Sequence, residues 1–141
     1  MPIRTGEQFL ESLKDDRQVF MDGERIRDIA GDPRTAGAAR TLAELYDMQH
    51  DPALADRMIF ASPSSGAPVG LSFIEPRSVD DLVRRRGMIK IWMDATCGMF
   101  GRSPDFLNVM LTGLAAAAAE FGRSDKRFAD NIRAYLSPAR P

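Results

Sequence analysis

The sequence predicts a mainly α-helical domain with a small β-hairpin element. Three observations support this prediction. Helix-start signals, in which a capping residue precedes proline or an acidic or amide side chain, recur along the chain. Apolar residues between these signals repeat at helical spacing. One Asp-Gly dipeptide with short apolar flanks marks a tight hairpin.

The composition is typical of a soluble globular protein with one domain. The chain has 141 residues, of which 44% are hydrophobic and 28% charged, and a chain of this length can bury a core without disulfides or metals. Its formal net charge is −1, so we expect no binding to nucleic acid or to a membrane. With Cys97 as the single cysteine we expect no disulfide and no metal site. The N-terminus lacks the apolar run of a signal peptide, which favours a cytoplasmic location.

The first elements are a short helix and a hairpin. Thr5 with Gln8 three residues later has the form of a capping box, which opens a helix. The segments Val19–Met21 and Glu24–Ile26 flank Asp22-Gly23, and both residues of this dipeptide tolerate the positive φ angles that a tight turn requires. We therefore expect an antiparallel pair here.

Asp-Pro dipeptides predict the next two helices. Asp32-Pro33 is an N-cap followed by proline in the first turn, and the helix is expected to run to about Met48. Asp51-Pro52 repeats this signal for a short segment through Arg57. The expected buried face of the longer helix consists of Ala38, Ala39, Leu42, Leu45 and Tyr46.

Between residues 58 and 74 the sequence is rich in β-branched and aromatic residues. It predicts two extended segments, Met58–Phe60 and Val69–Ile74, around a Ser-Pro-Ser-Ser-Gly turn. Ser78 with Asp81 is a second capping box, and the helix it opens is expected to end at Gly101. The residues expected along this helix include Val83, Ile89, Trp92, Met93, Thr96 and, near its end, Phe100.

Two further helices are predicted near the C-terminus. Ser103-Pro104-Asp105 combines an N-cap, a first-turn proline and an acidic residue that favours the helix dipole. Its buried stripe is expected to contain Leu107, Met110, Leu111, Leu114, Ala118 and Phe121. Ser124-Asp125 opens the last helix, which passes through Phe128, Ile132 and Tyr135.

Arg102 is the strongest candidate for chemistry because it precedes a helix start. The first amides of a helix have no intrahelical partner and carry partial positive charge. Together with a guanidinium they favour an anion, and Phe106 could supply an apolar wall. This arrangement suits a phenolate or an aromatic acid. The spacing alone also allows a structural alternative, in which Arg102 pairs with an acidic surface side chain and Phe106 packs in the core.

Six ordered blocks extend this evidence over nearly the whole chain. They are Arg4–Leu13, Asp22–Arg25, Ala39-Arg40 with Leu45–Pro52, Gly70–Ser78, Asp81–Arg86 and Gly101–Asn108. Together they resemble the N-terminal domain of the 4-hydroxyphenylacetate 3-monooxygenase family (large oxygenase component). That family is related to the pyoverdine-chromophore and chlorophenol FADH2-dependent monooxygenases.

The resemblance implies the helical N-terminal domain of an acyl-CoA dehydrogenase-like fold, spanning residues 1–141, with the family's β-barrel and C-terminal helix-bundle domains absent. It further implies a two-component enzyme that uses FADH2 from a separate flavin reductase. The flavin C4a-hydroperoxide would hydroxylate a 4-hydroxyphenylacetate-like phenol ortho to its hydroxyl group. We expect a homo-oligomer, because a domain without its neighbours leaves apolar surface exposed.

By the same resemblance Arg102 is catalytic and contacts the phenolic oxygen. Substrate binding is carried over to Arg102, Ser103, Pro104, Asp105 and Phe106. The family has tyrosine where this chain has Phe106, so a hydrogen bond to the substrate worth about 0.5–1.5 kcal/mol is absent and the identity of the phenol is open.

Whether this chain is an enzyme by itself is a separate question. The resemblance implies that most residues that bind FAD lie outside this chain, and the sequence contains no glycine-rich phosphate loop that could replace them. We therefore expect the chain alone to bind no FAD, and a complementing chain or further domains to complete the site. The alternative is a non-catalytic, stand-alone helical interaction domain derived from the same family.

Four other features favour structural roles. Cys97 is expected to be a buried helical residue, and one cysteine cannot match the iron–sulfur ligands of the related 4-hydroxybutyryl-CoA dehydratases. His50 is expected to act as a cap or surface residue. Asp94 needs a partner if it is buried. Arg84-Arg85-Arg86 could bind a phosphate, but three consecutive side chains point in three directions around a helix, which favours a solvated face.

Overall fold

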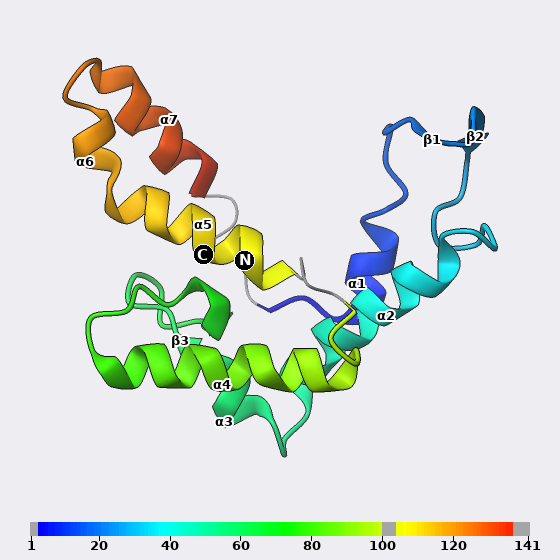
Figure 1. The fold of residues 1–141 in the computed structure, drawn as a ribbon, viewed down its shortest axis with the longest axis horizontal. Coiled ribbons are helices and arrows are strands. Elements are labelled where there is room, and N and C mark those ends of the chain that lie inside the picture. Colours follow the sequence, from blue (N-terminus) through cyan, green and yellow to red (C-terminus); the bar gives the residue numbers. More distant parts are fainter. Residues whose placement is uncertain (1–2, 100–103, 137–141) are drawn as a thin grey trace. The chain divides into compact units, whose positions relative to one another are not determined.

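The computed structural model describes residues 3–99 and 104–136. It contains two compact units, one of residues 4–54 and one of residues 1–3 with 55–141. Figure 1 shows that helices dominate both units. No helix among the described residues has the length and hydrophobicity needed to span a bilayer.

The unit of residues 4–54 begins with the predicted helix and hairpin. Helix α1 (Gly6–Glu11) has the expected capping box: the Gln8 backbone N–H donates to the Thr5 hydroxyl at 3.2 Å, and the Thr5 N–H donates to the Gln8 side chain at 3.0 Å. Strands β1 (Val19–Met21) and β2 (Glu24–Ile26) pair antiparallel. Asp22 and Gly23 connect them with φ angles of 53° and 80°, which confirms the predicted turn.

Helix α2 (Ala36–Asp47) begins later than predicted. The Asp32 side chain accepts the Arg34 backbone N–H at 2.9 Å, and the Asp32 carbonyl accepts the N–H groups of Thr35 and Ala36. Asp32 thus closes a local turn, and Thr35 occupies the cap position instead. A short 3-10 helix, η1 (Met48–His50), follows α2.

The buried face of α2 also differs from the prediction. Ala39 and Leu45 are buried as expected, whereas Ala38 is exposed and Ala43 takes its place. Ala38 precedes the buried Ala39 by one position, so its side chain is turned by roughly 100° from that of Ala39. The prediction for Ala38 was therefore wrong.

Helices α1 and α2 pack closely because Gly6 has no side chain. Its N–H donates to the Asp47 carboxylate at 2.6 Å. Beside this contact the rings of Phe9 and Tyr46 stack with their centroids 5.0 Å apart. The Arg4 guanidinium donates to the Tyr46 hydroxyl at 3.0 Å and lies over the Tyr46 ring. Together these contacts hold the two helices to each other.

The Asp32 turn predicts a pH dependence. Hydrogen bonds from the Arg34 side chain, and then from its backbone N–H, lower the pKa of Asp32 from 3.8 to about 2. A lowered pKa in the folded state means that ionised Asp32 contributes stability above its unfolded pKa and loses that contribution as pH falls through about 2. We expect Asp32→Asn to remove this part of the stability change between about pH 4 and pH 2.

Carboxyl chemical shifts followed by NMR measure the pKa of Asp32 directly. In the control variant Arg34→Gln, that pKa should rise toward its ordinary value. An Asp32 pKa near 3.8 in the unmodified protein would contradict the role assigned to Arg34.

The other unit begins with helix α3 (Ala55–Met58) and the antiparallel strands β3 (Ile59–Ala61) and β4 (Pro68–Gly70). The predicted extended segment Val69–Ile74 is correct only to Gly70. Residues Leu71–Phe73 form a 3-10 turn, η2, which the Ile74 N–H closes by donating to the Leu71 carbonyl at 3.1 Å. This turn buries both Leu71 and Ser72, which alternating strand geometry would place on opposite faces.

Helix α4 (Val79–Ala95) starts at the predicted Ser78 capping box. The pKa of Asp81 lies below its ordinary value because its carboxylate accepts the Arg77 N–H and hydrogen bonds from Ser78, and the Arg84 cation adds a smaller effect. The helix ends earlier than expected. Cys97 and Gly98 adopt φ angles of 51° and 73°, and the Gly98 N–H closes the end on the Met93 carbonyl at 2.8 Å. Gly101, the predicted end, lies outside the described residues.

Helices α5 (Pro104–Ala116), α6 (Ala118–Phe121) and α7 (Lys126–Leu136) complete this unit. We predicted α5 and α6 as one helix, but the chain breaks at Ala117. The break lets α6 fold back on α7, where a Cβ on Gly122 would lie 2.9 Å from the Ala129 side chain. The buried apolar side chains of this unit are Met58, Val69, Leu71, Ile74, Met88, Trp92, Ala118 and Ala129.

Several predicted core positions in this unit are exposed instead. They are Leu107, Met110 and Phe121 of the predicted buried stripe, while Ala118 is buried as expected. Val83, Phe128 and Tyr135, which were predicted to be helical, are also exposed. Apolar spacing identifies an apolar face of a helix, but it does not say whether another part of the same unit covers that face. In this unit the neighbouring elements cover other faces of α5 and α7.

Candidate functional site

The predicted site lies at the start of α5. Arg102 and Ser103 are outside the described residues, so their predicted positions stay predictions. Pro104 is the first residue of α5 and Asp105 follows it, as the start signal predicted. Phe106 is the predicted substrate-binding residue whose side chain the structure describes, and 52% of it is exposed.

A polar contact sets the orientation of α5. The Asn108 side-chain amide donates to the Ser72 hydroxyl at 2.9 Å, and Ser72 is only 1% exposed. One turn later the buried Thr112 hydroxyl donates to the Asn108 carbonyl at 2.8 Å. Asn108 and Thr112 share one side of the helix because they are four residues apart. This side therefore faces η2, with which α5 is in contact.

The outward side of α5 is apolar. Phe106, Leu107 and Met110 are 52%, 56% and 44% exposed, and we call these three residues the α5 apolar face. Phe106 and Met110 lie one helical turn apart and therefore adjoin on the helix surface. The alternative in which Phe106 packs in the core is wrong. The Phe106 ring is therefore exposed at the surface of this unit.

Asn108 and Ser72 are the residues that the sequence analysis missed. Both belong to blocks that carry the family resemblance, but neither received a role. An asparagine within an otherwise apolar helical stripe was the available signal, because a buried amide needs a partner. That the partner is Ser72 could not be predicted, since 36 residues separate the two.

The other single candidates have structural surroundings. Cys97 is exposed, so its predicted burial was wrong: the helix has already ended and the residue lies in a turn with positive φ. The exposed His50 ring places Nε2 3.1 Å from the Arg4 carbonyl oxygen, in agreement with the predicted structural role. Asp94 is exposed and pairs with Lys90 at 2.6 Å. Within residues 3–99 and 104–136 no group of histidine, cysteine or carboxylate side chains is arranged to hold a metal.

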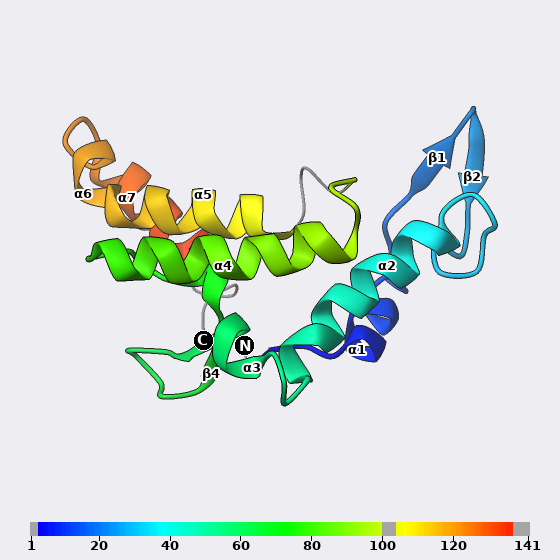
Figure 2. The same cartoon turned by 60° about the horizontal axis from the view of Figure 1, so that its bottom comes forward.

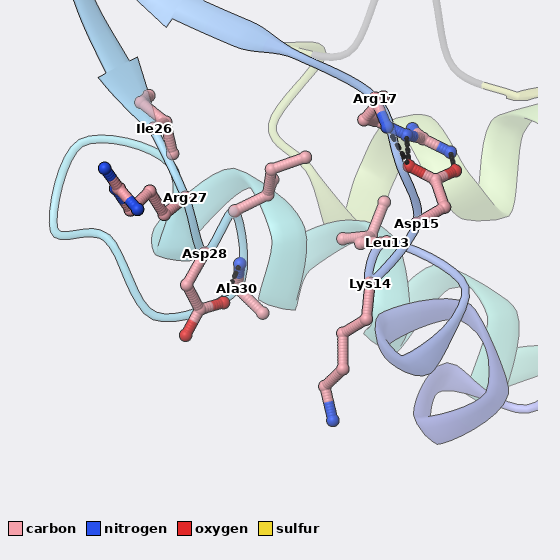
Figure 3. A pocket seen from close by; sticks show the side chains of 9 residues that line it. Leu13, Lys14, Asp15, Arg17, Ile26, Arg27, Asp28 and Ala30 are labelled. Carbon is pink, nitrogen blue, oxygen red and sulfur yellow. Dashed lines mark hydrogen bonds and ion pairs between the residues drawn. The ribbon is translucent and has the colours of Figure 1, made fainter.

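A shallow pocket of about 210 Å³ lies in the unit of residues 4–54, between the segment after α1 and the segment after β2 (Figure 3). Arg17 donates to both carboxylate oxygens of Asp15, and these bonds lower the pKa of Asp15. Leu13 and Ile26 line the apolar part. The pocket contains none of the predicted site residues.

Comparison with known proteins identifies the family. Residues 5–141 match the family model described as 4-hydroxyphenylacetate 3-hydroxylase N terminal. The chain belongs to this family. The match starts at the α1 cap and includes the whole of the start of α5, where the predicted substrate segment lies.

Three relatives show how much of the family's proteins this chain represents. The 4-hydroxyphenylacetate 3-monooxygenase oxygenase component of Geobacillus sp. (strain PA-9) is 36% identical, over 99% of this chain and 28% of the relative. The protein of the same name from Thermus thermophilus is 40% identical, over 94% and 26%. The 4-nitrophenol 2-monooxygenase oxygenase component of a Rhodococcus species is 37% identical, over 84% and 23%. The chain thus spans about a quarter of the length of these relatives.

Solved structures confirm the fold. A crystal structure of the oxygenase component of 4-hydroxyphenylacetate 3-monooxygenase superimposes with a TM-score of 0.88 at 38% identity, over 97% of this chain and 28% of that one. The same component complexed with FAD and 4-hydroxyphenylacetate matches with the same values. A 4-hydroxybutyryl-CoA dehydratase from N. maritimus, at 22% identity and a TM-score of 0.76, shares the fold. The prediction of a mainly helical, acyl-CoA dehydrogenase-like N-terminal domain is therefore confirmed, with two small sheets in it.

Proposed function

We propose that this chain is the N-terminal domain of a two-component, FADH2-dependent aromatic monooxygenase. Its substrate would be a 4-hydroxyphenylacetate-like phenol, hydroxylated ortho to the phenolic oxygen in the cytoplasm. The observation that carries the proposal is the α5 apolar face, which begins in the segment that binds substrate in our family-based hypothesis. An exposed aromatic side chain there suits one wall of a pocket whose other walls come from elsewhere.

In this proposal Arg102 and Phe106 have separate roles. The Arg102 guanidinium, beside the unpaired amides at the start of α5, stabilises negative charge on the phenolic oxygen. Phe106 contacts the aromatic ring of the substrate, and Ser103, Pro104 and Asp105 shape the segment between them. Reduced FAD supplies the oxygen-activating chemistry when bound, and a separate flavin reductase supplies the reduced FAD. The Asn108–Ser72 hydrogen bond holds α5 so that Phe106 stays on the outward side.

We call the assembly that would carry out this reaction the complete oxygenase: this chain together with the family's barrel and bundle domains, joined in one chain or supplied by a complementing chain. The test is to supply the complete oxygenase with reduced FAD, oxygen and 4-hydroxyphenylacetate, and to identify the product by chromatography and mass spectrometry. Formation of the ortho-hydroxylated product supports the proposal. Reduced FAD that is consumed with no hydroxylated phenol among several tested would contradict it.

A non-catalytic interaction domain is the second candidate, because an exposed apolar face can also bind a protein. The two candidates differ in what the α5 apolar face contacts. Met110→Lys should reduce hydroxylation in the first case. In the second case it should reduce association with a protein partner and leave no enzymatic effect to measure.

The chain alone is expected to bind FAD weakly or not at all. The described residues offer the isoalloxazine ring one open apolar face rather than an enclosed site, and enclosure supplies most of the binding surface of such ligands. A titration of the chain with FAD, followed by flavin fluorescence, measures this. The complete oxygenase serves as the control and should saturate. Tight, stoichiometric binding by the chain alone would show that it already contains the flavin site.

A further inference from the structure

Helices α3 and α4 are in contact (Figure 2). Residues of both helices line a pocket that the proposed function does not use. Its lining residues are Asp56, Arg57, Leu71, Arg84 and Gly87. The pocket volume of about 150 Å³ is well above the roughly 10–15 Å³ that one water requires. A small polar ion can therefore enter it.

Two arginines line this pocket from different helices. Arg57 belongs to α3 and Arg84 to α4. Neither forms an ion pair or hydrogen bond within the part of the chain that the structure describes. The nearby Asp81 carboxylate, on which Arg84 exerts a minor effect, is already occupied by the backbone N–H groups of Arg77 and Ser78. Each guanidinium thus retains its planar set of N–H donors, which matches the oxygens of an oxyanion.

The arginine run on α4 supplies only one of its three members to the pocket. Arg84 lines it, whereas Arg85 and Arg86 do not. Successive helical residues are turned by roughly 100°, so the three side chains leave α4 in different directions. Gly87 lies one turn after Arg84 and also lines the pocket. The space around its Cβ position is empty to at least 4 Å, so the absence of a side chain here leaves this part of the pocket open. The run Arg84–Arg86 therefore contributes one side chain to the pocket and does not form a continuous basic patch there.

Asp56 also lines the pocket and adds a hydrogen-bond acceptor to it. A carboxylate repels a fully deprotonated anion, but it accepts a hydrogen bond from an oxyanion that still carries a proton. Hydrogenphosphate has such an O–H near neutral pH, and a phosphate monoester has one when it is protonated, below its second pKa of about 6. Sulfate has none. The pocket thus combines donors for several oxygens with an acceptor for one proton.

We propose that Arg57, Arg84 and Asp56 form a binding site for a protonated phosphate group, either inorganic phosphate or the terminal group of a small monoester. The two arginines bind the phosphate oxygens, and Asp56 accepts the remaining P–O–H. The site prefers phosphate to sulfate for this reason. It is independent of the α5 apolar face, so either assignment can fail without the other.

The test is calorimetric titration of the full 141-residue chain with inorganic phosphate, phenyl phosphate and sulfate at constant ionic strength. We expect saturable binding of phosphate and at least about 10-fold weaker binding of sulfate, the cost of leaving a charged hydrogen-bonding group unpaired. Tighter binding of phenyl phosphate would assign the site to a monoester, and equal or weaker binding to the free ion. Absence of saturable binding, or equal affinities for phosphate and sulfate, would overturn the proposal.

Variants distinguish the site from general electrostatic attraction. Arg57→Gln and Arg84→Gln should each raise the Kd for phosphate about 10-fold or more. Arg86→Gln, which removes the same charge from the same helix outside the pocket, should change it less than about 2-fold. An equal effect of Arg84→Gln and Arg86→Gln would overturn the assignment. Asp56→Asn should reduce the preference for phosphate over sulfate.

A variant without a charge change tests the pocket itself. Gly87→Leu should weaken phosphate binding by filling the cavity, and leucine at this helical position favours the helix. Circular dichroism checks that each variant is folded. Unchanged phosphate affinity in folded Gly87→Leu would place any bound anion elsewhere.

Discussion

Arg102→Ala in the complete oxygenase is expected to lower kcat/KM for phenol hydroxylation about 10²–10³-fold, the loss typical of removing one donor from a developing oxyanion. Binding of reduced FAD should remain, because Arg102 is assigned to the substrate rather than to the flavin. The kcat/KM of Arg102→Lys should fall between the values of the unmodified enzyme and of Arg102→Ala, because lysine keeps the charge but loses the planar pair of donors. Steady-state hydroxylation and flavin binding, measured on the same preparations, test this expectation.

Arg123→Ala is the matched control for this substitution. Arg123 is an exposed arginine of the same unit that pairs with Glu120 at 2.9 Å, and an exposed pair of this kind contributes little to stability. Its removal should leave hydroxylation unchanged. Undiminished turnover in Arg102→Ala would remove Arg102 from the mechanism, and loss of flavin binding in the same variant would assign it a different role.

Gly6→Ala is expected to destabilise the unit of residues 4–54 by about 2–3 kcal/mol. The added Cβ would lie 2.5 Å from an Asp47 carboxylate oxygen and 2.6 Å from the Ala43 carbonyl oxygen. The Asp47 side chain can rotate away only by giving up its bond from the Gly6 N–H, and the Ala43 backbone is part of α2. Helix α1 must therefore shift, and with it the stacked Phe9 and Tyr46 rings.

Gly37→Ala provides the control in the same unit. Gly37 is a helical glycine of α2 with open space around its Cβ position, so alanine there should stabilise the helix by about 0.5–1 kcal/mol. Urea denaturation followed by far-UV circular dichroism measures both changes. Equal free energies of unfolding for Gly6→Ala and the unmodified chain would show that α1 and α2 do not pack at this distance.

The sequence predicted those features that depend on residues within about four positions of one another. The Thr5 and Ser78 caps, the Asp22-Gly23 turn and the start of α5 at Pro104 are all of this kind, and all are correct. Asp32 shows the limit even of local signals. An aspartate side chain can cap a helix or close a turn. Here the backbone N–H and the guanidinium of Arg34 donate hydrogen bonds to the Asp32 carboxylate, which holds it in the turn.

The candidate site was predictable in position but not in orientation. The Gly101–Asn108 segment was recognised by its similarity to a family, and the start signal placed Phe106 in the first turn of a helix. Helical periodicity treated Leu107 and Met110 as buried, whereas both are exposed. The spacing of apolar residues is the same whether a face contacts its own unit or another surface.

The sequence by itself determined which segments are helical, where most of them begin and to which family the chain is similar, because capping, turn formation and motif identity are properties of neighbouring residues. Only the tertiary structure decided which side of α5 is covered. The Asn108–Ser72 hydrogen bond joins residues 36 positions apart and turns Asn108 inward and Phe106 outward. A buried polar group requires a partner, and the fold rather than the local sequence supplies it.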